Sequence, residues 1–216
     1  AQRAAQGIAV NLNRLGEAIL GEDEARARHA VYLRTLERPD IEAVSVKVSS
    51  IASQINLLAW SDTLDVLEAR VGELYRAAMH HPIGGERARP KLVMLDMEEY
   101  RDLELTMALF ERLMGRDDLL DARAGIVLQA YLPDTHATQW RLVTLARERV
   151  ARGGRPIHVR LVKGANLAME RVDAAIHGWP QAPYKTKAEV DANYKRLVMF
   201  GMQHADVAHI GIASHN

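Results

Sequence analysis

Cysteine is absent from this chain of 216 residues, which excludes disulfide bonds, a thiolate nucleophile and cysteine-based zinc or iron–sulfur sites. An excess of one charge is absent too, because 28 lysines and arginines balance 28 aspartates and glutamates. A neutral surface has no overall attraction for nucleic acid or for an anionic membrane. No apolar run reaches the roughly 18 residues of a transmembrane helix, and the first residues lack a signal-peptide pattern. We therefore expect a cytoplasmic globular protein.

The short motifs of several common enzyme classes are also missing. The chain contains no GxGxxG, no GxxxxGK[ST] and no GxSxG sequence, so a Rossmann dinucleotide site, a P-loop and a serine nucleophile elbow are not expected. Neither HxH nor HExxH occurs among its 9 histidines, and we expect no metal site. Any chemistry must therefore come from residues that the fold brings together.

Short β-type runs alternate with longer helical patterns along the chain. Apolar residues at three- and four-residue steps predict helices near residues 22–37, 61–80, 98–115, 134–152, 165–177 and 187–204. Thr186 and Glu189 form a capping-box pattern at the start of the last helix. This alternation predicts a parallel sheet. The predicted strands are Gly7–Leu12, Ala43–Val48, Lys91–Met97, Gly125–Tyr131, Ile157–Val162 and His209–Ala213.

The phase of polar residues within the strands distinguishes a barrel from an open sheet. Open α/β sheets are apolar on both faces, whereas these strands have one apolar face and one face with a polar group near the carboxyl end. That pattern favours a (β/α)8 TIM-type barrel with a polar ligand at its mouth; a complete open six-stranded sheet is the alternative. We predict one truncated barrel domain over residues 1–216, with six βα units present and the last two lying beyond Asn216.

Three polar residues near strand ends are the first candidates for chemistry. Lys47 is costly to bury without a partner; it can bind a carboxylate, form a Schiff base or simply pair with Asp96. Asp96 lies where a strand gives way to a helix, the place of catalytic groups in barrel enzymes. The acids that follow, from Glu98 on, are interpreted as a solvated helix surface. Gln129 can bond a planar heterocycle through its amide, or a neighbouring strand end.

The strongest local signal is the sequence HVRLVKGAN. Arg160 is predicted to point inward, and Lys163 and Gly164 follow at the end of the strand. Two cations beside a glycine turn that opens a helix suit an anion, such as a phosphate, or an electron-rich ring. Among the histidines, only His215, which follows the last predicted strand, is a candidate for function.

Several segments carry a further signal through their order: NLNRLGEAIL, VSVKVSSI, LDMEEYRDLELT, GIVLQAYLPD, IHVRLVKGA, KTKAEVDANY and IASHN. In this order they resemble the proline dehydrogenases, in particular the flavin domain of bifunctional proline utilization A. The resemblance spans the chain, with RLVKGA at its centre. It implies a distorted (β/α)8 barrel with FAD at the carboxyl ends of its strands. It also implies oxidation of L-proline to Δ1-pyrroline-5-carboxylate, the first step of proline catabolism to glutamate.

The resemblance assigns roles to the inward polar residues. Lys47 matches the lysine that faces the substrate carboxylate, and Asp96 matches the acid that arranges the charges of the site. Arg160 matches the arginine beside the flavin N5 edge, so Asp96 and Arg160 are the expected catalytic residues. The residues that match the family's cofactor contacts are Met97, Gln129, Arg160, Val162, Lys163, Gly164, Ala165, Lys187, Ser214 and His215.

Two departures from the family pattern affect what we expect. Many relatives have Tyr-Trp after RLVKGA, whereas Asn166 and Leu167 follow here. The family also holds the proline carboxylate with an arginine pair on the last barrel helix, which is not in this sequence. We therefore expect the 216-residue chain to bind FAD weakly and to turn over proline poorly or not at all.

Partners follow from the same resemblance. They are L-proline or a related imino acid, a quinone as electron acceptor reached by peripheral contact with the inner membrane face, and a linked pyrroline-5-carboxylate dehydrogenase domain in the parent chain. No basic helix predicts nucleic-acid binding by this portion. Two other interpretations stay open: a Schiff-base lyase or aldolase that uses Lys47 or Lys163 as its amine, and a non-catalytic barrel fragment that serves as a scaffold.

Overall fold

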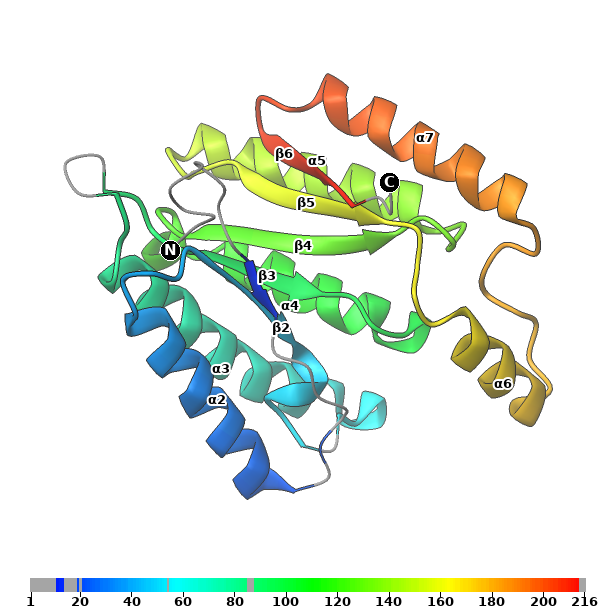
Figure 1. Ribbon diagram of the computed structural model, residues 1–216, viewed down its shortest axis with the longest axis horizontal. Coiled ribbons are helices and arrows are strands. Elements are labelled where there is room, and N and C mark those ends of the chain that lie inside the picture. Colours follow the sequence, from blue (N-terminus) through cyan, green and yellow to red (C-terminus); the bar gives the residue numbers. More distant parts are fainter. Residues whose placement is uncertain (1–10, 14–18, 20, 54, 85–87, 214–216) are drawn as a thin grey trace.

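A computed structural model describes residues 11–13, 19, 21–53, 55–84 and 88–213. Its strands are β1 (Asn11–Asn13), β2 (Ala43–Lys47), β3 (Leu92–Asp96), β4 (Arg123–Gln129), β5 (Ile157–Val162) and β6 (Ala208–Ile212). Its α-helices are α2 (Glu22–Glu37), α3 (Trp60–His80), α4 (Leu103–Met114), α5 (Thr135–Ala151), α6 (Leu167–His177) and α7 (Lys187–Gln203) (Figure 1). Strands and helices therefore alternate as predicted.

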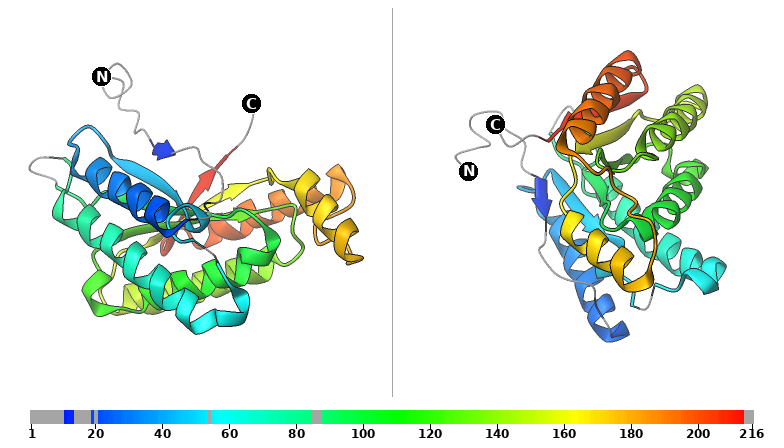
Figure 2. Two further views of the ribbon diagram at one scale, coloured as in Figure 1. Left: turned by 90° about the horizontal axis from the view of Figure 1, so that it is seen from below. Right: turned by 90° about the vertical axis from the view of Figure 1, so that its right-hand side faces the viewer.

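The strands form one sheet whose spatial order is their order in the chain, β1-β2-β3-β4-β5-β6, and every neighbouring pair is parallel. A doubly wound open sheet reverses its strand order at a switch point, and the described strands show no such reversal. Figure 2 shows α2, α3, α4, α5 and α7 following one another in an arc along the outer side of the sheet, while α6 lies apart, beyond the carboxyl ends of the strands. These features confirm the predicted α/β architecture, with the strands forming part of a barrel.

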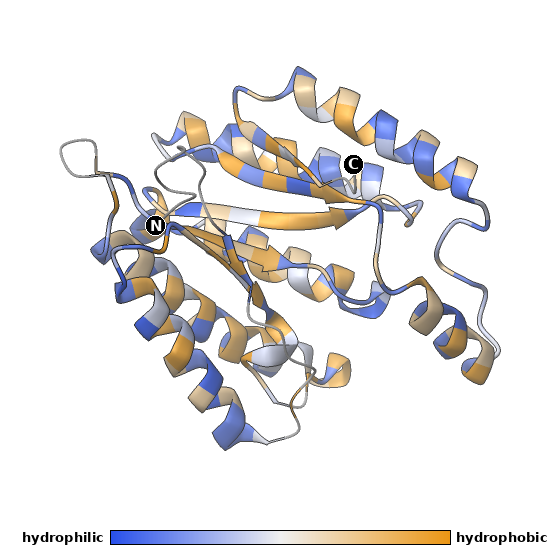
Figure 3. Cartoon of the chain, viewed as in Figure 1, coloured by the Kyte–Doolittle hydropathy of each residue, from blue (hydrophilic) through white to orange (hydrophobic). Residues whose placement is uncertain are grey.

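The core lies between the sheet and the helices. The strand residues whose side chains face the helices are apolar and buried: Val44, Val46, Val93, Leu95, Ile126, Leu128, Val159 and Leu161. Against them pack stripes such as Leu67, Val71 and Leu74 of α3, which recur at helical spacing and are fully buried. Figure 3 shows the same pattern, with apolar colour concentrated in the strands. Burial of this layer leaves the opposite strand face free to carry polar groups.

Two element boundaries differ from the predictions and matter for the site. The predicted helix at 98–115 begins with a 3-10 turn at Tyr100–Asp102 and becomes α-helical only at Leu103, so Glu98 belongs to the loop after β3. The described first strand runs through Asn13, one residue past its predicted end, while residues 7–10 lie outside the described part of the chain. The capping box at Thr186 and Glu189 is confirmed.

Two buried cations hold together the end of the sheet at which the strands begin. The Arg149 guanidinium, at the end of α5, donates to the carbonyl oxygens of Met114, Leu119, Leu120, Ala122 and Arg155. Lys91, before β3, donates to the carbonyls of Leu36 and Arg38. Carbonyl oxygens without a hydrogen-bond partner are costly to bury. These two side chains supply donors to such oxygens at helix ends and in loops below the sheet.

Candidate active site

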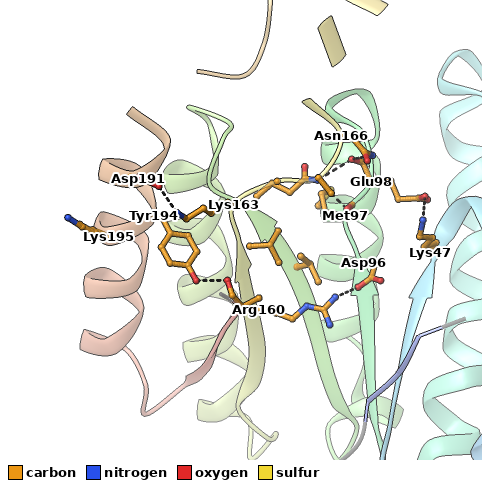
Figure 4. A pocket seen from close by; sticks show the side chains of 16 residues that line it. Lys47, Asp96, Met97, Glu98, Arg160, Lys163, Asn166, Asp191, Tyr194 and Lys195 are labelled. Carbon is orange, nitrogen blue, oxygen red and sulfur yellow. Dashed lines mark hydrogen bonds and ion pairs between the residues drawn. The ribbon is translucent and has the colours of Figure 1, made fainter. Parts of the chain in front are cut away.

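A cavity of about 960 Å³ opens at the carboxyl ends of the strands (Figure 4), the end at which barrel enzymes carry their active sites. Its volume is that of a site for a small molecule or cofactor. Strands β2 to β5, the loops after β3 and β5, helix α7 and the end of the chain's described part contribute to its wall. The lining residues are Lys47, Asp96, Met97, Glu98, Val127, Gln129, Arg160, Val162, Lys163, Gly164, Ala165, Asn166, Asp191, Tyr194, Lys195 and Ala213.

Most of the residues predicted from the sequence therefore lie in one cavity: Lys47, Asp96, Met97, Gln129, Arg160, Val162, Lys163, Gly164 and Ala165. Lys187 is exposed at the start of α7 and is absent from the described lining, but its Nζ lies 2.8 Å from Oδ2 of Asp191, which is a lining residue. Ser214 and His215 lie outside the described residues. The strand phases thus place the cations and the amide as expected.

A network of polar side chains crosses the barrel interior beneath the cavity. Arg160 forms an ion pair with Asp96 and donates from Nη1 to the Ser45 hydroxyl at 3.3 Å. From β1, Asn13 donates to Asp96 at 3.2 Å and Asn11 donates to Ser45 at 2.8 Å. Arg160 is therefore held at two points, with its guanidinium beside the buried carboxylate.

The electrostatics of Asp96 reflect this position. Burial raises the pKa of the Asp96 carboxyl, and the nearby charges of Arg160 and Lys47 oppose the rise. A carboxylate that depends on its cation for ionisation is sensitive to any ligand charge that enters the cavity. Perturbed groups of this kind are concentrated at functional sites, which supports a chemical role for the pair.

Lys47 pairs with a different acid from the one considered in the sequence. Its Nζ lies 3.0 Å from Oε1 of Glu98, although Lys47 and Asp96 are direct partners in the β2–β3 register. The interpretation of Glu98 as part of a solvated helix surface is wrong, because Glu98 precedes the helix and lines the cavity. Asp96 forms its ion pair with the Arg160 guanidinium, and Glu98 is the acid that pairs with Lys47.

The turn after β5 combines charge with close packing. Lys163 Nζ lies 2.6 Å from Oδ1 of Asp191, and Lys163 and Lys187 together lower the pKa of Asp191 to about 2 through their hydrogen bonds. Gly164 has φ +125°, and a Cβ built there would lie 2.4 Å from the Tyr131 ring. Only glycine fits this backbone and this contact, so the turn is held against β4.

Gly164→Ala is expected to distort the turn, since the added methyl must displace both backbone and aromatic ring. We expect a loss of about 1–3 kcal/mol in the free energy of unfolding. The matched control is Gly153→Ala, where φ is +84° but no described atom lies within 4 Å of the built Cβ. Urea unfolding of the two variants measures the loss; equal behaviour of both would remove the packing argument.

The lining residues also fit a planar heterocyclic cofactor. Gln129 donates from Nε2 to the carbonyl of Glu98 at 3.1 Å, while its buried Oε1 finds no hydrogen-bond partner among the described residues. An unpaired buried acceptor is costly, and a ligand N–H removes that cost. Arg160 and Lys163 supply donors nearby, so the wall presents both the acceptor and the donors that a flavin ring and its phosphates require.

A second buried acid lies behind the loop after β3. Burial, followed by the charges of Glu99, Glu98 and Glu170, raises the pKa of Asp102 to about 6, against the opposing charge of Arg101. A raised carboxyl pKa in the folded state means that ionisation disfavours folding. The penalty is absent below about pH 4, grows as the pH rises toward 6 and stays constant above that.

Asp102→Asn is therefore expected to raise the free energy of unfolding by about 2–3 kcal/mol above pH 6, with the gain disappearing near pH 4. Urea denaturation across this pH range measures it, and Asp206→Asn, at an exposed acid, serves as the control. A gain that does not depend on pH would show that burial of the charge is not the cause.

The comparisons with known proteins agree with the geometry. The family model "Proline dehydrogenase" matches residues 1–216, and the chain belongs to the proline dehydrogenase family. It is 26% identical over 201 residues to "Proline dehydrogenase 2" of Bacillus subtilis strain 168, covering 91% of this chain and 54% of that protein. The chain therefore spans about half the length of this curated relative.

Solved structures show the same relationship. The chain is similar to Proline Utilization A (PutA) from Corynebacterium freiburgense, with 42% identity and a TM-score of 0.92 over 99% of this chain and 22% of that one. It is also similar to PutA from Bdellovibrio bacteriovorus, inactivated by N-propargylglycine, with 30% identity and a TM-score of 0.86 over 100% of this chain and 24% of that one. The barrel architecture is thus shared with much longer proteins.

Some site residues were not predicted from the sequence. Asn11 and Asn13 share a strand phase, so the parity argument used for the other strands contained the signal that they point inward. Glu98 and Asp191 lie in a loop and on a helix, where no such rule applies. Both amines of the lyase interpretation, Lys47 and Lys163, are held by carboxylates, so neither is directed as a nucleophile at a substrate carbonyl.

Proposed function

We propose that this chain forms the flavin-binding part of an enzyme that oxidises L-proline to Δ1-pyrroline-5-carboxylate. The observation that carries the proposal is the convergence of Lys47, the Arg160–Asp96 pair and the unpaired acceptor of Gln129 on one cavity of a proline dehydrogenase family member. We also propose that residues 1–216 belong to a single barrel domain. A quinone accepts the electrons, and the parent chain carries a linked pyrroline-5-carboxylate dehydrogenase.

The residues that would hold FAD are those around the turn after β5 and the ends of β3 and β4. Gln129 and Arg160 would bond the ring, Lys163 and Lys187 would bind the phosphates or ribose, and the remaining contacts would be Met97, Val162, Gly164, Ala165, Ser214 and His215. When bound, the flavin accepts two electrons from the substrate carbon beside the amine nitrogen. The chain supplies the positions and charges around that event.

Each charged side chain has a distinct task in this scheme. The Lys47 ammonium binds the substrate carboxylate and so places the ring of the amino acid in the cavity. Asp96 holds the Arg160 guanidinium in one orientation, since its carboxylate is buried and the Ser45 hydroxyl accepts a further hydrogen bond from the guanidinium. Arg160 keeps a positive charge on the cavity wall, beside the place where the reduced acceptor ring would carry added electron density. A charge that is fixed before the reaction stabilises that density more than mobile water does.

Reconstitution tests the proposal. The chain is expressed within its complete reading frame, loaded with FAD and examined for the absorbance of bound flavin and for proline-dependent reduction of a dye. We expect bleaching of the flavin by L-proline in the absence of oxygen, and none by glycine, which lacks the ring. Borohydride treatment with a keto acid tests the lyase alternative; a trapped lysine adduct together with no bleaching by proline would overturn the proposal.

A further inference from the structure

Glu98 stands where four segments of the site meet (Figure 4). Its carboxylate contacts Lys47 at 3.0 Å and accepts a hydrogen bond from the Ser49 hydroxyl. Its backbone carbonyl accepts from Gln129 Nε2 at 3.1 Å and from Asn166 Nδ2 at 2.9 Å. The side chain of Glu98 is only 16% exposed. One residue therefore connects the end of β2, the end of β4 and the turn after β5.

We propose that Glu98 is a positioning residue with two functions, one carried by its side-chain carboxylate and the other by its backbone carbonyl. Its carboxylate fixes the Lys47 ammonium for the carboxylate of the substrate, and its carbonyl fixes both the Gln129 amide and the turn that ends at Asn166. The inference rests on the proposed function, because it assigns the ligands that these groups receive. It adds a residue that touches neither the reacting carbon nor the cofactor.

The carboxylate end restrains a flexible cation. A lysine has a four-carbon stem and loses rotamer freedom when its ammonium is held, and Lys47 is partly exposed at the cavity wall. Glu98 takes one N–H direction of the ammonium, which has three, so others remain for a ligand. The substrate carboxylate can therefore approach the Lys47 ammonium without displacing Glu98.

The carbonyl end determines the direction of an amide. A carbonyl oxygen has two lone pairs, and those of Glu98 are used by Gln129 and Asn166. Because Nε2 of Gln129 is directed to this carbonyl, its buried Oε1 is left as the unpaired acceptor described above. Asn166 attaches the turn that contains Gly164 to the same point.

The carboxylate end is tested with cyclopentanecarboxylate, a ring carboxylate without an oxidisable amine. Its affinity is measured by calorimetry on the FAD-loaded protein, expressed within its complete reading frame. We expect Glu98→Ala to weaken binding about tenfold, the loss of one charge-assisted hydrogen bond, and Glu98→Gln to restore most of the affinity because it keeps an acceptor oxygen. With proline, the KM rises in Glu98→Ala while kcat changes little.

Glu99→Gln is the matched control, because Glu99 is the next residue and pairs with the exposed Arg101. It is expected to bind the probe as the wild type does. Wild-type or tighter binding by Glu98→Ala would show that Glu98 competes with the ligand and would overturn the proposal; so would equal losses in the Gln and Ala variants. Absence of proline oxidation by the wild type, with the same binding series intact, would refute the proposed function alone.

The carbonyl end is tested through its partner. Asn166→Ala removes the donor, and we expect FAD to leave about tenfold faster, as followed by the fluorescence of released flavin, while the affinity for cyclopentanecarboxylate at saturating FAD stays unchanged. Asn56→Ala, at an exposed asparagine before α3, controls for loss of an amide. Release of FAD by Asn166→Ala at the wild-type rate would overturn this half of the proposal.

Discussion

Replacement of Arg160 by methionine is expected to lower kcat/KM for proline at least about a hundredfold, the effect of removing one preorganised charge from an active site. The variant loses the positive charge on the cavity wall and leaves Asp96 buried beside Lys47 alone. Because Arg160 opposes the rise in the pKa of Asp96, its removal also raises that pKa further. The pH at which activity falls on the acid side should therefore move upward.

Arg160→Lys separates charge from geometry. Lysine keeps the charge, but a single ammonium cannot reproduce the fork that contacts both Asp96 and Ser45, so only partial recovery is expected. Arg141→Met is the control, because Arg141 is an exposed arginine paired with Glu104 and Glu111 on the outer helices. Initial rates of dye reduction measured from acid to neutral pH check all three variants. Wild-type kcat/KM in Arg160→Met would remove Arg160 from the mechanism.

The inward side chains could be predicted because a strand has a fixed two-residue period. Lys47, Asp96, Gln129 and Arg160 each share a phase opposite to the apolar residues of their strands, and parallel strands bring their carboxyl ends to one rim. The part of the cavity wall that the strands supply follows from these two rules, whereas the part supplied by the loops and by α7 does not. Asn13 obeys the same rule, and its strand was predicted to end one residue too early.

The ion-pair partners could not be predicted in the same way. Lys47 and Asp96 are opposite each other in the register, and neighbouring strands alone would pair them. Which acid pairs with Lys47 is decided partly by Arg160, which comes from a strand more than 60 residues later and forms an ion pair with Asp96. It is also decided by the backbone after β3, whose extended residues before the 3-10 turn bring Glu98 back over Lys47. Periodicity carries no information about such loops.

The end of the barrel remote from the cavity depends on contacts that no local pattern reveals. The carbonyls around Arg149 come from the end of α4, the segment before β4 and the segment before β5. Helical spacing puts Arg149 on the buried stripe of α5, three residues after Ala146 and seven after Leu142, but it does not reveal which carbonyls the guanidinium meets. In the structure it is 1% exposed, and burial lowers its pKa.

Arg149→Met is for this reason expected to be the most destabilising of the substitutions considered. Methionine keeps a long side chain but leaves several buried carbonyl oxygens without a donor. Removal of a buried charged group that makes this many hydrogen bonds lowers the free energy of unfolding by about 3–5 kcal/mol. For a domain of this size that corresponds to a fall of roughly 6–20 °C in Tm. Differential scanning calorimetry and urea unfolding of the complete protein measure it.

Arg147→Met provides the matched control, two residues away on the same helix. Arg147 is exposed and contacts His204, so its replacement should change the free energy of unfolding by less than about 0.5 kcal/mol. Arg149→Lys should fall between the two, because an ammonium has three donors where the guanidinium has five. Since the Arg149 cluster lies at the end of the sheet opposite the cavity, kcat/KM measured well below the Tm should be unchanged in Arg149→Met. A small loss of stability combined with a large loss of activity would mean that Arg149 acts on the site and not on the fold.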